Sequence, residues 1–244
     1  MALPKRQIKD EEQRKIFGKI FDNLVIQDLF KLKAKGIYDT YGGLLEEGKE
    51  SRILLVYKDE EPRIIKIYKI EAGNFKNMLR YLEGDERFKK IRERRRDIIY
   101  AWCKKEYHNL LIAKKVGISS PEPYDYIHNI IAMEMLGENA PYPQLKDIVL
   151  SKPEKVLKNI LSQIEILLKK GKLVHGDISE FNILIDSKER PYFIDFGQAV
   201  LTSHPFAKEF LKRDIKNLIN YFYKEYNIEN DADEIYARMC NGVF

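Results

Sequence analysis

Apolar and polar positions change their period along the chain, and these changes predict helices and strands. Between Lys5 and Lys35 apolar residues recur every three or four positions, which is typical of an amphipathic helix, and Gly36 ends the pattern. Residues 52–57 and 63–70 instead alternate between apolar and polar side chains. We therefore expect two strands joined as a β-hairpin around a turn that contains Pro62.

A helical period returns from Ile98 to Val116 and stops at Gly117, and the "SSPEP" that follows predicts an extended connection. Two short strands are expected next, at residues 124–128 and 130–135. The sequence "LGENAPYP" after them reads as a link between two lobes.

The second half of the chain is predicted to be mainly helical. Ser151 and Glu154 have the spacing of a capping box, with Pro153 in the first turn, and an apolar stripe then continues to Gly171. The remaining elements expected are two short strands followed by two helices, at residues 183–185, 192–194, 206–223 and 229–239.

Length and composition restrict the class of protein. The chain has 244 residues, of which 44% are hydrophobic, enough for one domain of two lobes or for two small domains with a sizeable core. Its two cysteines form no CxxC pair, so neither a disulfide framework nor a zinc site is indicated. No apolar run approaches the roughly 20 residues of a membrane helix, and no secretory signal is present. We expect a soluble, cytoplasmic protein without membrane contact.

The positive charge is local. The formal net charge is +5, and "KKIRERRR", residues 89–96, carries six basic residues and one glutamate, which accounts for all of it. Such a run attracts the phosphates of nucleic acid or ATP through charge alone. A solvated helix face explains it equally well at this stage.

Three polar side chains interrupt apolar runs between Leu173 and Val200. Asp177 and Asn182 are five residues apart, and Asp195 ends an apolar strand. Isolated carboxylates are costly to desolvate, so a shared ligand is expected, and Asp and Asn oxygens suit Mg²⁺. An Asp-x-x-x-x-Asn followed by Asp-Phe-Gly is the arrangement of phosphoryl transfer in protein kinases. In that chemistry the first Asp accepts the attacking proton, while Asn and the later Asp hold the metal.

Kinase chemistry also requires a lysine that pairs the phosphates and a glutamate that holds this lysine. Lys66 lies within "RIIKIYK", an unfavourable place for a solvated charge. Glu106 shares a helix face with Trp102 and Leu110, so it too is expected to point inward and to need a partner. Each of the two charges explains the other, although Lys66 could also extend to solvent from an edge strand.

A candidate phosphate-binding turn precedes the hairpin. "GGLLEEGKES" has glycines at the spacing of a Walker A loop, but Glu50 occupies the position of the metal-binding Ser or Thr, and a strand follows instead of a helix. We therefore interpret Gly48, Lys49, Glu50 and Ser51 as a turn whose backbone amides can cover phosphates. A plain hairpin turn is the alternative.

The segments "GKES", "IKIYK", "WCKKEYHNL", "MEMLG", "HGDISEFNIL" and "IDFGQAV" together resemble the RIO family of atypical serine/threonine protein kinases. Their order and spacing match from about Gly43 to Tyr223. "HPFAKEFLKRDIKNL" and "IKIYK" look like the type-one branch of that family, and the resemblance points to an archaeal source.

This resemblance implies an α+β, bilobal protein-kinase-like fold in one domain, residues 1–244. It implies a small antiparallel-sheet N-lobe with one key helix over about residues 1–135, including a helical extension at 1–36. A hinge at about 133–140 would lead to a reduced, mainly helical C-lobe at about 141–244.

By motif match, Asp177 would be the catalytic base, and Asn182 and Asp195 the metal ligands. The cofactor-binding residues would be Gly48, Lys49, Glu50, Ser51, Lys66, Glu106, Glu134 and Leu136, the last two through backbone groups to adenine. Met133 to Leu136 could equally be an ordinary buried strand end. The cofactors implied are ATP and Mg²⁺, with Mn²⁺ as a substitute.

The resemblance also implies a role in maturing the small ribosomal subunit, with ribosomal RNA and proteins as partners. Two alternatives stay open at this point. The chain could be an ATP-gated assembly factor with little kinase activity, passing a phosphoryl group only to Asp195 or to water. It could also be a small-molecule kinase of the aminoglycoside or choline type, which shares "HGD" and "IDF" but lacks "GKES" before the first hairpin. The sequence does not define the phosphoacceptor or the oligomeric state.

Overall fold

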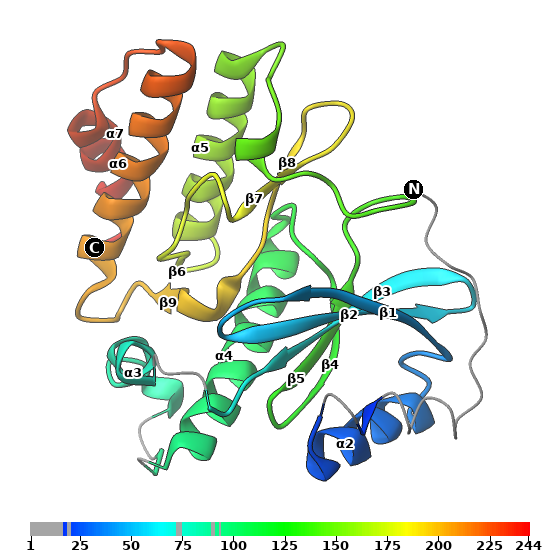
Figure 1. Ribbon diagram of the computed structural model, residues 1–244. Coiled ribbons are helices and arrows are strands. Elements are labelled where there is room, and N and C mark those ends of the chain that lie inside the picture. The colour runs from blue at the N-terminus through cyan, green and yellow to red at the C-terminus, as the bar shows by residue number, and fades with distance from the viewer. Residues whose placement is uncertain (1–16, 19–20, 72–74, 89–90, 93) are drawn as a thin grey trace.

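The computed structural model describes residues 17–18, 21–71, 75–88, 91–92 and 94–244. A five-stranded antiparallel sheet and one long helix occupy one part of the molecule, and helices dominate the other part (Figure 1). The predictions for residues 1–16 lie outside the described residues.

The sheet has the strand order β1-β2-β3-β5-β4. Its strands are β1 (Thr40–Glu47), β2 (Ser51–Lys58), β3 (Glu61–Tyr68), β4 (Pro123–Ile127) and β5 (Ile130–Glu134). The predicted hairpin is present as β2–β3, but its turn does not contain Pro62. Asp59 and Glu60 form the turn, both with positive φ (48° and 68°), and Pro62 pairs with Tyr57 inside the ladder. A two-residue turn of this kind matches the twist of the strands, so the ladder continues past the proline.

The two faces of the sheet contact different elements because side chains alternate along a strand. Ile65 and Ile67 on β3 pack against α2 (Asn23–Ala34). Tyr68, which shares the opposite face with Lys66, belongs to the core around the long helix. The helix predicted from Lys5 to Lys35 is interrupted in its described part, because Asp22 is extended (ψ 164°) and its carboxylate caps the amide of Val25 at 2.9 Å.

The long helix α4 (Arg95–Val116) ends at Gly117, which adopts φ 80° as a C-cap, as the sequence predicts. It runs beside the sheet and continues toward the helical part of the molecule (Figure 1). The connection from β3 contains a helix that the sequence did not predict, α3 (Phe75–Leu82), and a 3₁₀ turn, η1 (Glu86–Phe88).

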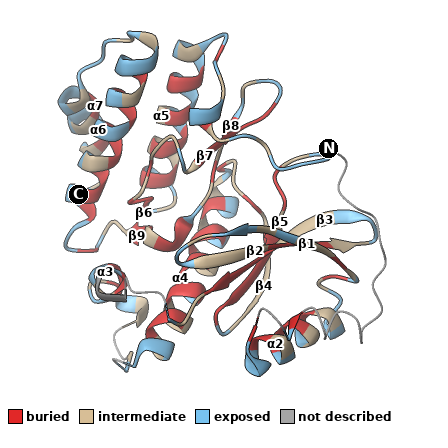
Figure 2. Ribbon diagram, in the orientation of Figure 1, coloured by how far each residue is buried: buried red, intermediate tan, exposed pale blue. Residues whose placement is uncertain are grey.

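The second half is built on three helices, α5 (Pro153–Lys169), α6 (Ala207–Tyr226) and α7 (Ala232–Cys240). α5 and α6 turn buried faces toward the core, whereas α7 lies outside them (Figure 2). The remaining elements are short: η2 (Leu145–Asp147), β6 (Leu173–Val174), β7 (Ile183–Ile185), β8 (Pro191–Phe193), η3 (Phe196–Gln198) and β9 (Val200–Leu201). Two-stranded ladders pair β6 with β9 and β7 with β8.

The predicted capping box at Ser151 is wrong. α5 begins at Pro153 and its N-cap residue is Lys152, with no side-chain cap. The carboxylate of Glu189, from the turn between β7 and β8, instead accepts the amides of Ser151 and Lys152, the latter at 3.1 Å. A tertiary partner therefore replaces the local one.

Within the part of the chain that the structure describes, no helix combines the length and the apolar character needed to cross a bilayer.

Candidate active site

The candidate site forms where the sheet face that carries Lys66 meets α4 and the loops of the helical half. Lys66 Nζ lies 2.9 Å from Glu106 Oε1 and 3.1 Å from Asp195 Oδ1. Tyr68, two residues along β3, donates its hydroxyl to the other oxygen of Glu106. The contact predicted between Lys66 and Glu106 is thus present. Asp195, which is 129 residues from Lys66 in the sequence, also contacts this lysine.

The three charges stabilise one another although burial opposes them. Lys66 and Glu106 are 8% and 1% exposed. Burial alone would lower the pKa of Lys66, but attraction to Asp195 and Glu106 outweighs it and raises the pKa. Partial desolvation tends to raise the pKa of Asp195, yet attraction to Lys66 outweighs it and holds this pKa below its usual value. Lys66 is therefore a cation and Asp195 an anion at neutral pH.

Asp177 and Asn182 meet on the loop after β6. The Asn182 amide donates to the backbone carbonyl of Asp177 at 2.8 Å and to its Oδ2 at 2.9 Å, and Gln198 Nε2 donates to the same Oδ2 at 2.9 Å. Burial and repulsion from Asp195 raise the pKa of Asp177, although Arg213 and Asn182 oppose the shift. A carboxylate held in place with a raised pKa can accept a proton from a hydroxyl.

Buried side chains hold this loop from below. Asp214 on α6, 1% exposed, accepts the amides of Gly176 at 2.7 Å and Ile178 at 3.2 Å. Arg213 donates to the carbonyl of Gly176. His175 is buried against the ring of Phe196, 4.7 Å between centroids.

Gly176 itself is required by the loop. Its φ is +77°, and a Cβ there would lie 2.9 Å from the carbonyl oxygen of Gln198. The glycine of "HGD" therefore lets the loop approach the segment after Asp195.

The oxygen donors fit a hard divalent cation. The Asp195 side chain is 46% exposed in spite of its ion pair, so the ionised carboxylate can also face a ligand. The Asn182 side-chain nitrogen already donates to Asp177, so the side-chain oxygen is the atom that can coordinate a metal. Among the described residues no group of three or more His, Cys, Asp or Glu could hold a metal on its own. Mg²⁺ needs only one or two protein oxygens, because phosphate and water complete its shell, so the oxygens of Asn182 and Asp195 would be enough to hold it.

The turn at residues 48–51 joins β1 to β2 at the same end of the sheet. Gly48 N–H donates to the carbonyl of Ser51 at 2.9 Å, and the Glu50 carbonyl accepts the amide of Lys69 at 2.8 Å. Lys49 and Glu50 are exposed. Repulsion from Glu50 contributes to the raised pKa of Asp177.

The segment predicted as a hinge follows β5. Glu134 N–H donates to the carbonyl of Glu122 at 2.8 Å, and Leu136 carbonyl accepts the amide of Tyr142 at 2.9 Å. The Glu134 N–H and the Leu136 carbonyl therefore already have backbone partners.

Sequence reasoning did not assign Tyr68, Gln198 or Arg213 to the site. Tyr68 lies two residues after Lys66, so the period of a strand could have identified it. Arg213 precedes Asp214 on an otherwise apolar helix face. For Gln198 no pattern was available, because its contact with Asp177 depends on the path of the chain after Asp195.

Known proteins resemble this chain over most of its length. The family model described as RIO domain matches residues 52–235. RIO-type serine/threonine-protein kinase Rio1 of Haloferax volcanii is 34% identical over 232 residues, covering 94% of this chain and 79% of the relative. Rio1 of Methanocaldococcus jannaschii is 37% identical, covering 88% and 73%, and Rio1 of Thermoplasma acidophilum is 40% identical, covering 70% and 89%.

Solved structures give the same fold. The Rio2 kinase from Chaetomium thermophilum, in a complex with ADP/Mg²⁺-phosphoaspartate, superimposes with a TM-score of 0.68 at 20% identity, covering 90% of this chain and 68% of that one. The bilobal kinase-like fold is therefore confirmed. The sequence matches, which extend across most of the chain, establish that it belongs to the RIO family, as a RIO-type serine/threonine-protein kinase.

Proposed function

We propose that this kinase transfers the γ-phosphoryl group of ATP in a Mg²⁺-dependent reaction, in a cleft between an N-lobe of about residues 1–135 and a C-lobe of about residues 141–244. The observation that carries the proposal is the position of Lys66, held between Glu106 at 2.9 Å and Asp195 at 3.1 Å. A lysine fixed in this way presents a permanent cation to the phosphates of a nucleotide.

Asp177 is the general base in this proposal. Asn182 and Gln198 orient its carboxylate. The raised pKa of Asp177 makes this carboxylate a better proton acceptor at neutral pH than an ordinary aspartate. Asp214 fixes the backbone on both sides of Asp177 through the amides of residues 176 and 178. The base is therefore held in one geometry before the acceptor hydroxyl arrives.

Asn182 and Asp195 would hold Mg²⁺ or Mn²⁺. When bound, the ion neutralises charge on the transferring phosphates. The 48–51 turn would cover the phosphates with backbone amides, and the segment 134–136 would meet adenine.

We further propose a role in maturation of the small ribosomal subunit, with RNA as a partner. Arg94, Arg95 and Arg96 are exposed at the N-terminal end of α4, and Lys89, Lys90 and Glu93 of the same run lie outside the described residues. Cations at a helix N-terminus oppose the helix dipole, so an anionic partner there would relieve an unfavourable interaction. A phosphodiester backbone supplies such charge.

An ATP-gated assembly factor with little transfer to protein substrates is the second candidate. The related Rio2 complex is described as a phosphoaspartate, which favours an aspartate as a transient acceptor in that protein. In this chain Asp195 is the aspartate that we expect to play that part. Membership of the RIO family argues against the small-molecule kinase alternative.

The experiment is single-turnover incubation of the pure protein with γ-labelled ATP and Mg²⁺, followed by separation of the products. Label on protein serine supports a protein kinase, and acid-labile label that hydroxylamine releases as an acyl phosphate supports the phosphoaspartate route. Free phosphate alone indicates an ATPase, and label on an added small molecule would restore the rejected alternative. The proposal fails if ATP is not consumed, or if Asp177→Ala and Asp195→Ala turn it over at the wild-type rate.

A further inference from the structure

A cluster of buried polar side chains lies beneath the segment that follows Asp195 and touches none of the groups assigned to the reaction. Lys105 and Asn109 on α4 are fully buried at 0% exposure, and Asp85 is 1% exposed. Arg87, the fourth member, comes from η1. Burying so many polar groups is unfavourable unless each has a partner, so the partners define what the cluster does.

The partners of Lys105 and Asn109 are backbone carbonyls of residues 196–199. Lys105 Nζ donates to the carbonyl of Gly197 at 2.8 Å and to that of Ala199. Asn109 Nδ2 donates to the carbonyls of Phe196 at 2.9 Å and Ala199 at 2.8 Å. Three of the four carbonyls directly after Asp195 are therefore fixed by two side chains of one helix.

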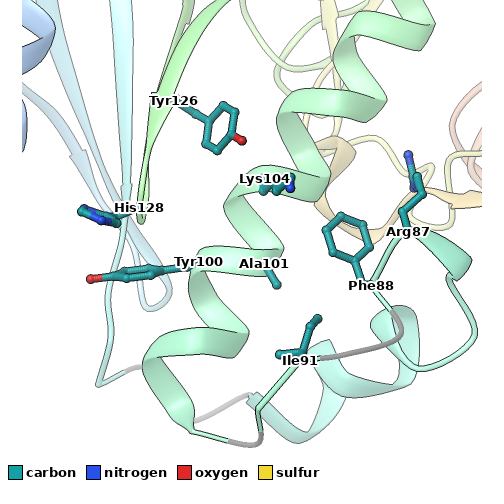
Figure 3. A pocket seen from close by; sticks show the side chains of 8 residues that line it. All are labelled: Arg87, Phe88, Ile91, Tyr100, Ala101, Lys104, Tyr126 and His128. Carbon is teal, nitrogen blue, oxygen red and sulfur yellow. The ribbon is translucent and has the colours of Figure 1, made fainter.

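Arg87 and Asp85 fix the orientation of Asn109. The Arg87 guanidinium donates to Asn109 Oδ1 at 2.9 Å and is paired with both carboxylate oxygens of Asp85, at 2.6 and 2.9 Å. Because the arginine occupies the amide oxygen, the amide nitrogen must face the carbonyls. Arg87 also lines a surface pocket of about 380 Å³ on the outer side of α4 (Figure 3), so this end of the cluster reaches the surface.

The segment held in this way needs support. Asp195 has φ 62° and ψ 68°, a left-handed conformation that is unfavourable for a residue with a Cβ. α4 also carries Glu106, which holds Lys66. One rigid helix thus sets both the glutamate and the aspartate on the two sides of Lys66.

We propose that Lys105 and Asn109 are positioning residues that hold Asp195 in its metal-binding conformation, with the Asp85–Arg87 pair fixing Asn109. The inference rests on the proposed role of Asp195 as a metal ligand. The cluster acts on Asp195 through the backbone of residues 196–199, whose carbonyls accept its hydrogen bonds. It therefore determines metal affinity rather than nucleotide affinity.

The test is Lys105→Met, which removes the ammonium group and keeps the rest of the side chain at nearly the same length. Binding of Mn²⁺ in the presence of ADP is followed by electron paramagnetic resonance, and binding of a fluorescent nucleotide is measured in EDTA. We expect Mn²⁺ affinity to fall about tenfold or more, the size of effect seen when the support of a metal ligand is removed, with nucleotide affinity in EDTA unchanged. Lys104→Met, on the exposed side of the same turn of α4, is the matched control and should leave both unchanged.

A wild-type Mn²⁺ affinity in folded Lys105→Met would overturn the inference. If that variant does not fold, Arg87→Ala provides the test, because the Arg87 side chain is 24% exposed and only the anchor of Asn109 is lost. Its Mn²⁺ affinity should fall severalfold and recover partly in Arg87→Lys; no change in Arg87→Ala would equally contradict the inference. Asp195→Ala distinguishes failure of the proposed function from failure of this inference. If Asp195→Ala still binds Mn²⁺ with wild-type affinity, the proposed function fails. If Asp195→Ala loses Mn²⁺ but Lys105→Met and Arg87→Ala bind it normally, only this inference fails.

Discussion

Lys66, Glu106 and Asp195 show what a sequence discloses about single residues. The ion pair between Lys66 and Glu106 could be predicted from the sequence. Each residue is a charge at an apolar position of a helix or strand, where burial is tolerable only with a partner of opposite charge. The cluster around Lys105 was missed, although Ile98, Trp102, Lys105 and Asn109 are buried at helical spacing. That signal was present, but lysine and asparagine on a charged helix are more often solvated, so the spacing alone did not separate Lys105 from exposed Lys104.

The first prediction concerns Asp177. Asp177→Ala should lower the rate of phosphoryl transfer by about two to four orders of magnitude, because the general base is lost. Nucleotide binding should change little, since the lysine and the metal ligands are intact. Stopped reactions with labelled ATP measure the rate, and a turnover equal to that of the wild type would contradict the assignment.

The second prediction concerns His175 and stability. Burial lowers the pKa of His175 from 6.5 to about 4, so the folded protein keeps this ring neutral where the unfolded chain takes up a proton. The free energy of unfolding should therefore decrease as pH falls from 6.5 to 4, by about 3 kcal/mol from this residue.

Urea unfolding at several pH values checks this, with His175→Gln as the comparison. The variant should show a smaller decrease over the same window, because glutamine does not titrate. Equal slopes in the two proteins would exclude His175 as the source.

Among the elements, those defined by a long apolar period were predicted well. β2, β3, α4 and α5 all lie where the pattern placed them. Local signals at the ends were less reliable: the cap of α5 comes from Glu189 rather than Ser151, and the turn of the hairpin precedes Pro62. α3 was not predicted at all. The ends of helices and strands depend on residues that are distant in sequence, whereas the apolar stripe of an element is visible in its own sequence.

The packing of η3 on α4 gives a third prediction. A Cβ at Gly197 would lie 2.7 Å from Nε1 of Trp102, so Gly197→Ala should push the segment after Asp195 away from the helix. A misplacement of about 1 Å at the site can lower kcat about a hundredfold. Trp102→Phe provides room and should restore part of the activity in the double variant, with Trp102→Phe alone as control. Independent, additive losses would contradict the steric explanation.

For the whole molecule, the fold class was predictable because the order of strands and helices and the spacing of motifs both pointed to a kinase. What could not be derived is how the catalytic segments are held together, since those contacts join α4, α6 and the loops after β6 and β8.

The fourth prediction tests the basic run. Neutralising Arg94, Arg95 and Arg96 should weaken RNA binding and reduce the slope of log affinity against log salt by about two to three, because fewer counterions are released. A variant with Lys155, Lys158 and Lys224 replaced by alanine has the same change in charge at exposed positions of α5 and α6 and should keep the wild-type slope. Equal slopes in both variants would leave the run without a specific role in RNA binding.

The most direct measurement is a crystal structure with Mn²⁺ and a non-hydrolysable ATP analogue, with the metal located by anomalous scattering. We expect a peak at coordinating distance from the Asn182 side-chain oxygen and the Asp195 carboxylate, and the terminal phosphates beside Lys66. A nucleotide bound elsewhere, or a metal without contact to either side chain, would contradict the account.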